Sequence, residues 1–207
     1  MFDLVLWIAL FGTAVFAVSG ALMALRQGMD FIGVSFIATV TGIGGGTFRD
    51  ILLGDTPLSW VLDPTPVAVC IGCALICCFF NRFLIGRRMK WLLYADALGL
   101  AMFAALGAQK AELAGAHPLV IVLFGAVSAS FGGVIRDVIC NEPPVLLRQE
   151  IYISAAILGA LVYVLIPPDI AFNIRLVASV GAALGLRTIA IWRGWSLNFP
   201  KPIYPKE

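Results

Sequence analysis

The sequence has little charge, and that scarcity excludes most soluble classes. Lys, Arg, Asp and Glu make up 13% of the 207 residues, about half of the roughly 25% found in soluble domains. Hydrophobic residues reach 61%, and the mean hydropathy is +0.99. No long basic run is present, so we expect no nucleic-acid partner. The composition predicts an integral membrane protein.

Histidine is scarce, and the cysteines are confined mostly to one segment. The single histidine, His117, lies in a short loop before a proline. Hydrolytic and zinc-dependent sites commonly need histidine, so we do not expect an enzyme. Four of the five cysteines lie in one apolar run without histidine or carboxylate: Cys70, Cys73, Cys77 and Cys78. We interpret them as small packing residues, and we predict no metal and no cofactor.

Seven apolar runs can be read as transmembrane helices. They cover residues 4–25, 31–48, 66–80, 91–108, 118–135, 151–166 and 176–192. An odd number of spans places the termini on opposite sides of the membrane. Eleven Lys and Arg residues fall on the side that follows the odd-numbered spans, and three fall on the other side. The positive-inside rule therefore predicts a cytoplasmic C-terminus and an external N-terminus.

The first three runs match the next three at a shift of 87 residues without a gap. The matches include residue types that are rare in membrane helices: Gly45, Gly46, Arg49 and Asp50 recur as Gly132, Gly133, Arg136 and Asp137. Each copy has three spans, so the second copy is inverted in the membrane. We predict one all-α transmembrane domain over residues 1–207. It comprises repeat one (4–83), inverted repeat two (91–168), a seventh helix (174–192) and a basic tail (193–207).

Both copies carry glycines inside an apolar run, where each costs about 1 kcal/mol relative to alanine in a helix. We predict that Gly44, Gly45 and Gly46 break the second helix, and that Gly132 and Gly133 break the fifth. Matched, broken helices in inverted repeats are typical of transport pathways. Backbone groups freed within a membrane must face protein or a water-filled cavity. Tight helix packing at small residues is the alternative.

Polar side chains near the glycine elements are candidates for lining or gating a pathway: Thr41, Thr47, Ser128, Ser130, Lys110 and Asp96. Hydrogen bonding of the hydroxyls to their own helix is an equally good interpretation. Asp96 begins the fourth span and can act as its cap. Lys110 and Glu112 form a solvated pair if that span ends near residue 108, and lie within the membrane if it continues. Arg187 lies one turn from the basic end of span seven, where we expect it to snorkel.

Two acid–base pairs are expected at the mouths of the pathway. The predicted topology places Arg49 and Asp50 on the outer side and Arg136 and Asp137 on the cytoplasmic side. The carboxylates would attract cations, and the arginines would anchor them through charge-assisted hydrogen bonds.

The glycine elements resemble the prokaryotic branch of the trimeric intracellular cation channel family. The similar residues are 44–50, the following Gly54-Asp55-Thr56-Pro57, the second copy at 132–137, and stretches 96–103 and 107–111. Bacterial members also carry a domain described as a glycine transporter. The resemblance covers residues 2 to 192 and implies a homotrimer in a bacterial or archaeal inner membrane. It also implies one pore per protomer, lined by glycine-kinked spans two and five, with potassium or sodium as permeant ion. Membrane lipids are implied partners, and Lys110 is the candidate residue for lipid binding.

We predict a passive monovalent-cation channel, chiefly for potassium. A carrier of glycine or another small neutral amino acid is the alternative, because carriers also use inverted repeats and interrupted helices. The residues do not separate these two functions.

Overall fold

The computed structural model describes residues 2–80, 88–147 and 151–196. Seven helices coincide with the seven predicted runs, namely α1, α2, α4, α6, α7, α8 and α9. A further helix, α3, is a single turn in the loop after α2. The predicted basic tail, from residue 197 onward, lies outside the described residues. The elements are α1 (Phe2–Arg26), α2 (Phe31–Leu53), α3 (Ser59–Leu62), α4 (Thr65–Phe79), α6 (Arg88–Leu113), α7 (Pro118–Ile139), the 3-10 helix η1 (Val145–Leu147), α8 (Ile153–Leu165) and α9 (Phe172–Arg193).

Local sequence sets the helix ends. Asp30 caps α2, because its carboxylate accepts a hydrogen bond from the backbone N–H of Gly33 at 2.8 Å. Gly54 ends α2 in the left-handed conformation with φ of +71°, which glycine adopts without a steric penalty. His117 caps α7 by accepting a hydrogen bond from the Leu119 N–H at 3.3 Å.

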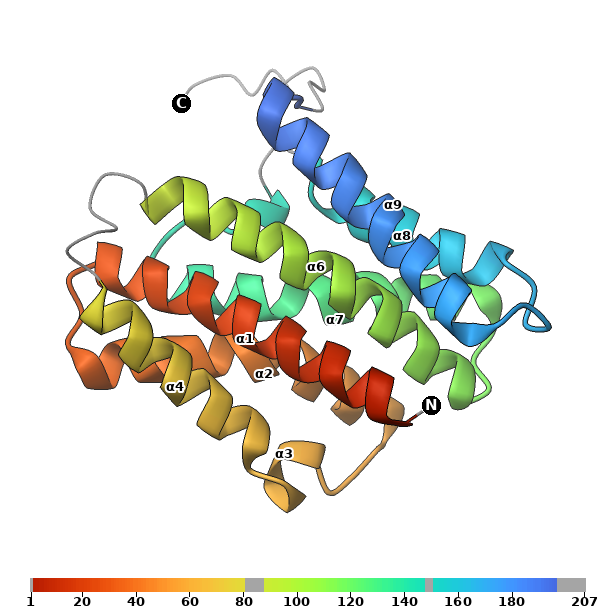
Figure 1. Ribbon diagram of the computed structural model, residues 1–207, viewed down its shortest axis with the longest axis horizontal. Helices are drawn as coiled ribbons and strands as arrows, with labels where there is room; N and C mark the ends of the chain where they lie inside the picture. Colours follow the sequence, from red (N-terminus) through yellow and green to blue (C-terminus); the bar gives the residue numbers. More distant parts are fainter. Residues whose placement is uncertain (1, 81–87, 148–150, 197–207) are drawn as a thin grey trace, which may run out of the picture.

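The main helices run in alternating directions along the long axis of the bundle (Figure 1). Among the described residues, five helices are long and apolar enough to cross a membrane, namely α1, α2, α6, α7 and α9. Helices α4 and α8 are apolar but shorter, with 15 and 13 residues. We call the end of the bundle where α1 begins the Asp50 end, and the opposite end, which holds the last turns of α7, the Asp137 end.

Four helices form the centre of the bundle. Helix α1 packs against α2 and α6, and α7 packs against the same two helices. Helix α4 covers α1 and α2, whereas α8 covers α6 and α7, and α9 lies against α6 and α8. The pathway residues predicted from the sequence all lie on α2, α6 and α7, so the fold gathers them at this centre.

Contacts within the centre occur in pairs that are 87 residues apart. Gly12 faces the ring of Phe103, and Gly99 faces the ring of Phe16; the two rings stack with centroids 5.3 Å apart. A Cβ added at Gly20 would lie 2.8 Å from the carbonyl oxygen of Ile37, and one added at Gly107 would lie 2.7 Å from that of Phe124. The same glycine-to-neighbour packing therefore holds α1 on α2 and α6 on α7.

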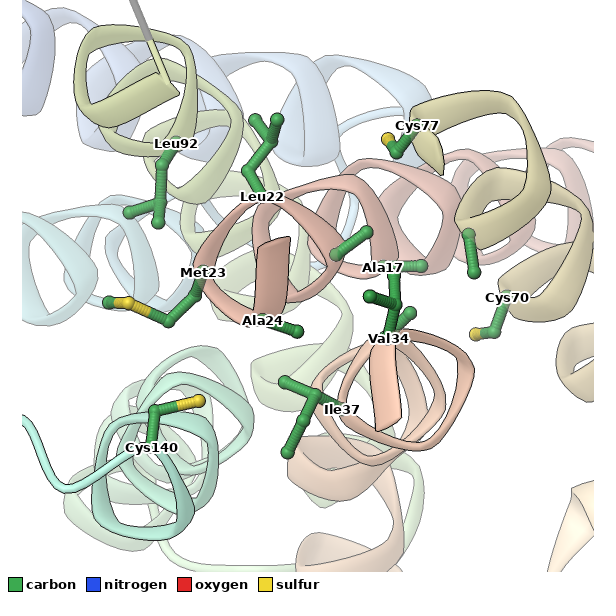
Figure 2. Close-up of a cluster of buried hydrophobic side chains, with 13 residues drawn as sticks. Ala17, Leu22, Met23, Ala24, Val34, Ile37, Cys70, Cys77, Leu92 and Cys140 are labelled. Atoms are coloured by element: carbon green, nitrogen blue, oxygen red, sulfur yellow. The ribbon is translucent and has the colours of Figure 1, made fainter. Parts of the chain in front are cut away.

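The cysteines of α4 pack within an apolar cluster toward the Asp137 end. Figure 2 shows Cys70 and Cys77 with side chains from α1 and α2, and Cys140 beside Met23. Cys70 has no exposed surface, and a Cβ added at Gly42 would lie 2.6 Å from its sulfur. This close approach agrees with the interpretation of the α4 cysteines as small packing residues.

Candidate functional site

Helices α2 and α7 approach each other most closely at the predicted glycine elements. A Cβ added at Gly45 would overlap the carbonyl oxygen of Ser128, and one added at Gly132 would overlap the carbonyl oxygen of Thr41. The side chains beside this crossing also pack tightly, because the rings of Phe48 and Phe131 stack with centroids 3.9 Å apart. Only glycine permits this backbone-to-backbone contact.

The prediction that these glycines break their helices is wrong. Helix α2 is continuous α-helix through Gly44, Gly45 and Gly46, and α7 is continuous through Gly132 and Gly133. The glycines cost helical stability, but the close contact between α2 and α7 offsets that cost. Their carbonyls stay in the helical ladder, and the alternative interpretation, packing at small residues, describes the crossing.

Two of the candidate hydroxyls bond to their own helix. Thr41 donates to the Ile37 carbonyl at 2.6 Å, and Ser130 donates to the Ala126 carbonyl at 2.7 Å. Thr47 instead accepts a hydrogen bond from the indole N–H of Trp60 at 2.9 Å. The back-bonding interpretation is thus confirmed for Thr41 and Ser130, and Thr47 fastens α3 to α2.

A charge cluster lies at the Asp50 end. Asp50 is 2% exposed, and its Oδ1 lies 2.7 Å from Nη2 of Arg49 and 2.9 Å from Nζ of Lys110. Lys110 also contacts Oδ2 of Asp55 at 2.5 Å, and Nη1 of Arg49 donates to the Ser128 hydroxyl at 3.5 Å. This group, which we name the outer cluster after the orientation expected from the sequence, contains two cations and two carboxylates, and it joins α2, α6, α7 and the loop after α2.

The ionisation of Asp55, the loop carboxylate of the outer cluster, depends on Lys110. The hydrogen bond and the charge of Lys110 hold the pKa of Asp55 below its usual value. Asp55 is exposed, whereas its partner Lys110 is half-buried. The loop is consequently tied to α6 by an ion pair whose carboxylate stays ionised at neutral pH.

A cavity of about 590 Å³ opens beside the outer cluster. Its wall includes Asp50, Arg49 and Lys110 together with Gly46 and Phe103, and other lining residues come from α1, α3, α4, α8 and α9. Two further carboxylates, those of Asp63 and Glu112, also line the cavity, and most of the remaining lining residues are apolar. A cation entering this cavity would meet a buried carboxylate next to the α2–α7 crossing.

A second charge cluster lies at the Asp137 end and is closed. Arg136 has no exposed surface and Asp137 is 1% exposed. Nε of Arg136 donates to Asp137 Oδ1 at 2.9 Å, and Nη1 donates to Asp96 Oδ1 at 2.5 Å and also to the Ser19 hydroxyl. Asp137 Oδ2 accepts a hydrogen bond from the backbone N–H of Val145 at 3.0 Å. This group, which we name the inner cluster after the same expected orientation, contains one cation and two carboxylates.

Two sequence-based expectations fail at the inner cluster. Arg136 and Asp137 are not at an open mouth, because α1, α6 and η1 enclose them. Asp96 is not a cap, since α6 begins at Arg88 and Asp96 lies two turns inside it, 2% exposed. A carboxylate within an apolar helix requires a partner, and Arg136 of α7 supplies it.

The seventh helix is fastened by two arginines that sequence reasoning did not assign to this role. Arg175 makes a two-point ion pair with Glu112, at 2.7 and 3.1 Å, and lies over the ring of Tyr163 at 4.2 Å. Arg187 is 2% exposed, donates to the Ile151 carbonyl at 3.2 Å and lies 5.1 Å from the ring of Tyr152. The expected snorkelling of Arg187 is wrong, and Glu112 pairs with Arg175 rather than with Lys110.

Comparison with known proteins places this arrangement in a family. The profile of the family described as Glycine transporter matches residues 6–82 and 93–168. The chain is 44% identical over 162 residues to the UPF0126 inner membrane protein YadS of Escherichia coli K12, which covers 77% of each chain. It superposes on the crystal structure of the TRIC trimeric intracellular cation channel orthologue from Rhodobacter sphaeroides with a TM-score of 0.88 and 40% identity, over 93% of this chain and 99% of the other. The chain belongs to the prokaryotic TRIC family.

A further TRIC structure supports this assignment. A prokaryotic TRIC channel crystallised in KCl matches with a TM-score of 0.90 and 30% identity, over 94% of this chain and 98% of the other. The resemblance noted from the glycine elements is therefore confirmed. These structural neighbours are described as channels rather than enzymes, and the YadS relative is described as an inner membrane protein.

The TRIC fold brings most of the predicted site residues together, in two separate groups. The outer cluster unites Arg49, Asp50, Lys110 and Ser128, whereas Asp96 joins the inner cluster. Sequence reasoning missed Ser19 at the inner cluster. A signal for Asp96 was available, because it and Arg136 are opposite charges inside apolar runs, where unpaired charges are costly.

Proposed function

We propose that the protein conducts monovalent cations, chiefly potassium, through one pathway in each protomer. The observation that carries the proposal is the position of Asp50. It is a buried carboxylate on the wall of the 590 Å³ cavity, directly beside the crossing of α2 and α7. The acidic residues Asp50, Asp63 and Glu112 outnumber the basic residues Arg49 and Lys110 on the cavity wall, and an excess of negative charge in a low-dielectric wall raises the local concentration of cations. The description of the structural neighbours as cation channels agrees with this assignment.

The architecture that we propose is two inverted three-helix repeats and a seventh helix. The paired contacts of Gly12 with Phe103 and of Gly99 with Phe16 support it, since each residue and its counterpart are 87 apart. The two contacts at the crossing are related in the same way: Gly45 contacts Ser128, and their counterparts 87 residues away, Gly132 and Thr41, contact each other. Such exchanged contacts are expected from a two-fold axis in the membrane plane. On this proposal α4 and α8 also cross the membrane, although they are short.

The pathway is proposed to pass the α2–α7 crossing, which is closed in this conformation. On the Asp50 side a cation reaches the cavity wall formed by Gly46 and Arg49. On the Asp137 side Arg136 and Asp137 are enclosed by protein. Opening requires the backbones to separate near Gly45 and Gly132, where carbonyl and hydroxyl oxygens can replace part of the hydration shell of potassium.

Assembly and orientation complete the proposal. We propose a homotrimer in a prokaryotic inner membrane with a separate pathway in each subunit, because the solved relatives are described as trimeric. We further propose that the Asp50 end faces outward and that the C-terminus is cytoplasmic, from the distribution of Lys and Arg. Surrounding lipids are the other partners. Cross-linking in mild detergent is expected to give trimers, and a ladder that stops at dimers contradicts this assembly.

Planar-bilayer recording of the purified protein in potassium chloride tests the proposed function. We expect unitary currents whose reversal potential follows the potassium gradient, with little chloride contribution. Replacement of potassium by a large organic cation is the matched control and is expected to abolish the current. Saturable uptake of glycine into proteoliposomes without unitary currents would overturn the channel and favour the carrier.

A further inference from the structure

The cavity at the Asp50 end has a mostly apolar wall. Its volume of about 590 Å³ lies within the range of small-molecule sites, about 300–1,000 Å³. Much of the wall consists of aliphatic side chains from α1, α2 and α6, such as Leu10, Ile43 and Leu106. Aliphatic groups cannot replace the water around a potassium ion, but they bury the surface of alkyl groups favourably. The wall therefore suits a ligand that brings apolar surface of its own.

The charges on the wall select a cation. The wall carries three carboxylates and two cationic groups, which belong to Asp50, Asp63, Glu112, Arg49 and Lys110. Two partners that are not part of the wall, Asp55 and Arg175, add one charge of each sign, so the acidic excess remains. Both cationic groups of the wall are already paired with Asp50, at 2.7 and 2.9 Å. An anion would have to compete with these pairs, whereas a cation complements the acidic excess.

Trp60 presents an aromatic ring to the cavity. It belongs to α3 and is half-buried, and its indole N–H donates to the Thr47 hydroxyl at 2.9 Å, which holds the ring against α2. Among the described side chains, no other ring or guanidinium stacks on Trp60. The Tyr163 ring of the same wall is covered by Arg175 at 4.2 Å. Tryptophan attracts quaternary ammonium ions through its ring face more strongly than tyrosine or phenylalanine does.

We infer that this cavity is a binding site for hydrophobic organic cations, quaternary ammonium ions above all, and that an ion held there blocks the pathway. The alkyl groups lie on the aliphatic wall, and the positive charge faces Asp50 and the ring of Trp60. The block rests on the proposed function, whereas the binding site rests on the cavity alone. The site gives the protein a class of inhibitor that a pathway lined only by oxygen atoms would not bind.

Calorimetric titration of the purified protein in a non-ionic detergent tests the site without requiring a current. The probes are tetramethylammonium, tetrabutylammonium and hexanesulfonate, an apolar anion. We expect tetrabutylammonium to bind at least about tenfold tighter than tetramethylammonium, because its longer alkyl groups bury more apolar surface. Hexanesulfonate should bind at least about tenfold more weakly than tetrabutylammonium, because of the acidic excess. Equal affinities of the two ammonium ions, or tighter binding of hexanesulfonate, overturn the proposed site.

Variants of Trp60 test the aromatic contact. Trp60→Leu keeps apolar bulk but removes the ring, and it should weaken tetrabutylammonium binding by about threefold to tenfold. Trp60→Phe keeps a ring face but loses the hydrogen bond to Thr47, so it should retain more of the affinity. The matched control is Trp7→Leu, which should leave the affinity unchanged, because Trp7 is 69% exposed and is not part of the wall. Unchanged affinity in Trp60→Leu, or equal losses in Trp60→Leu and Trp60→Phe, contradict a cation on the ring.

Planar-bilayer recording separates the site from the proposed function. Tetrabutylammonium added on the Asp50 side should block potassium currents, and Trp60→Leu should raise the blocking concentration by the factor that calorimetry gives. Potassium currents that saturating tetrabutylammonium leaves untouched overturn the blocking role and leave the proposed function standing. Binding of tetrabutylammonium that depends on Trp60, in a protein without potassium currents, refutes the channel and leaves the binding site standing.

Discussion

Alanine at Gly45 is the smallest change that tests the α2–α7 crossing. Its added methyl group points at the backbone carbonyl oxygen of Ser128, at a separation far below the 3.0 Å that real Cβ atoms keep. The obstructing atom belongs to the backbone of α7, so no side-chain rotation relieves the overlap. The two helices have to move apart, and the stacked rings of Phe48 and Phe131 move with them.

The expected magnitude follows from two opposing terms. Overpacking of a close contact costs about 1–3 kcal/mol, whereas replacing glycine by alanine inside a helix gains about 1 kcal/mol. Gly45→Ala should therefore destabilise the protein by up to about 2 kcal/mol. Gly72→Ala on α4 is the matched control, because a Cβ there meets no atom within 4 Å; it should stabilise the protein by up to about 1 kcal/mol.

Thermal unfolding in detergent measures this difference. For a chain of this size, 1 kcal/mol shifts the midpoint by about 2–4 °C. The two variants should thus fall on opposite sides of the wild-type midpoint. A Gly45→Ala protein as stable as the Gly72→Ala protein would show that the backbones are not in contact at the crossing, and the proposed closed point would then be wrong.

Three further predictions follow from the charged groups. Asp50→Asn should lower potassium conductance, most at low ionic strength because salt shortens the reach of a charge; equal losses in low and high salt, by single-channel recording, contradict the assignment. Lys110→Met should raise conductance, because it removes an ammonium group from Asp50 and Asp55; methionine is the residue found 87 positions earlier, at Met23. Lys110→Arg keeps the charge and should not raise conductance. Lys110 lowers the pKa of Asp55, so their pair persists above the usual aspartate pKa of about 3.9 and is lost only as the pH falls through the lower folded-state value. A titration of conductance on the Asp50 side between about pH 8 and pH 5 should therefore show no step that comes from Asp55. The Asp55→Asn variant should give a curve of the same shape in this range.

The helices were predictable because lipid requires long apolar runs, and these are visible without any tertiary information. The match at a shift of 87 residues was equally visible, since Arg, Asp and paired Gly are rare in such runs. The contact that the glycines make with a neighbouring helix could not be predicted from the sequence. A glycine that breaks a helix and a glycine that admits a neighbouring backbone have the same local sequence, and only the position of Ser128 opposite Gly45 distinguishes them.

The ion pairs show where sequence reasoning stops. Pairing within Arg49–Asp50 and Arg136–Asp137 is local and was anticipated. The partners of Glu112 and Asp96 come from other helices, 63 and 40 residues away. Which helices become neighbours depends on packing of the whole bundle, so Glu112 was associated with the nearby Lys110 and Asp96 with a helix end.

The attachment of α9 makes the two halves of the bundle mechanically unequal. Arg175 ties α9 to α6 and α8 through Glu112 and Tyr163, and Arg187 ties it to the segment before α8 through the Ile151 carbonyl. Helices α6, α8 and α9 with α7 therefore form a braced four-helix block, whereas α1, α2 and α4 have no comparable brace among the described contacts. Deforming the block breaks the pair between Arg175 and Glu112, whereas moving α1 and α2 relative to the block breaks the links of Ser19 to Arg136 and of Asp50 to Lys110. Helix α9, which has no counterpart in the repeat, thus gives the second half of the bundle polar links between helices that α1, α2 and α4 do not make with one another among the described contacts.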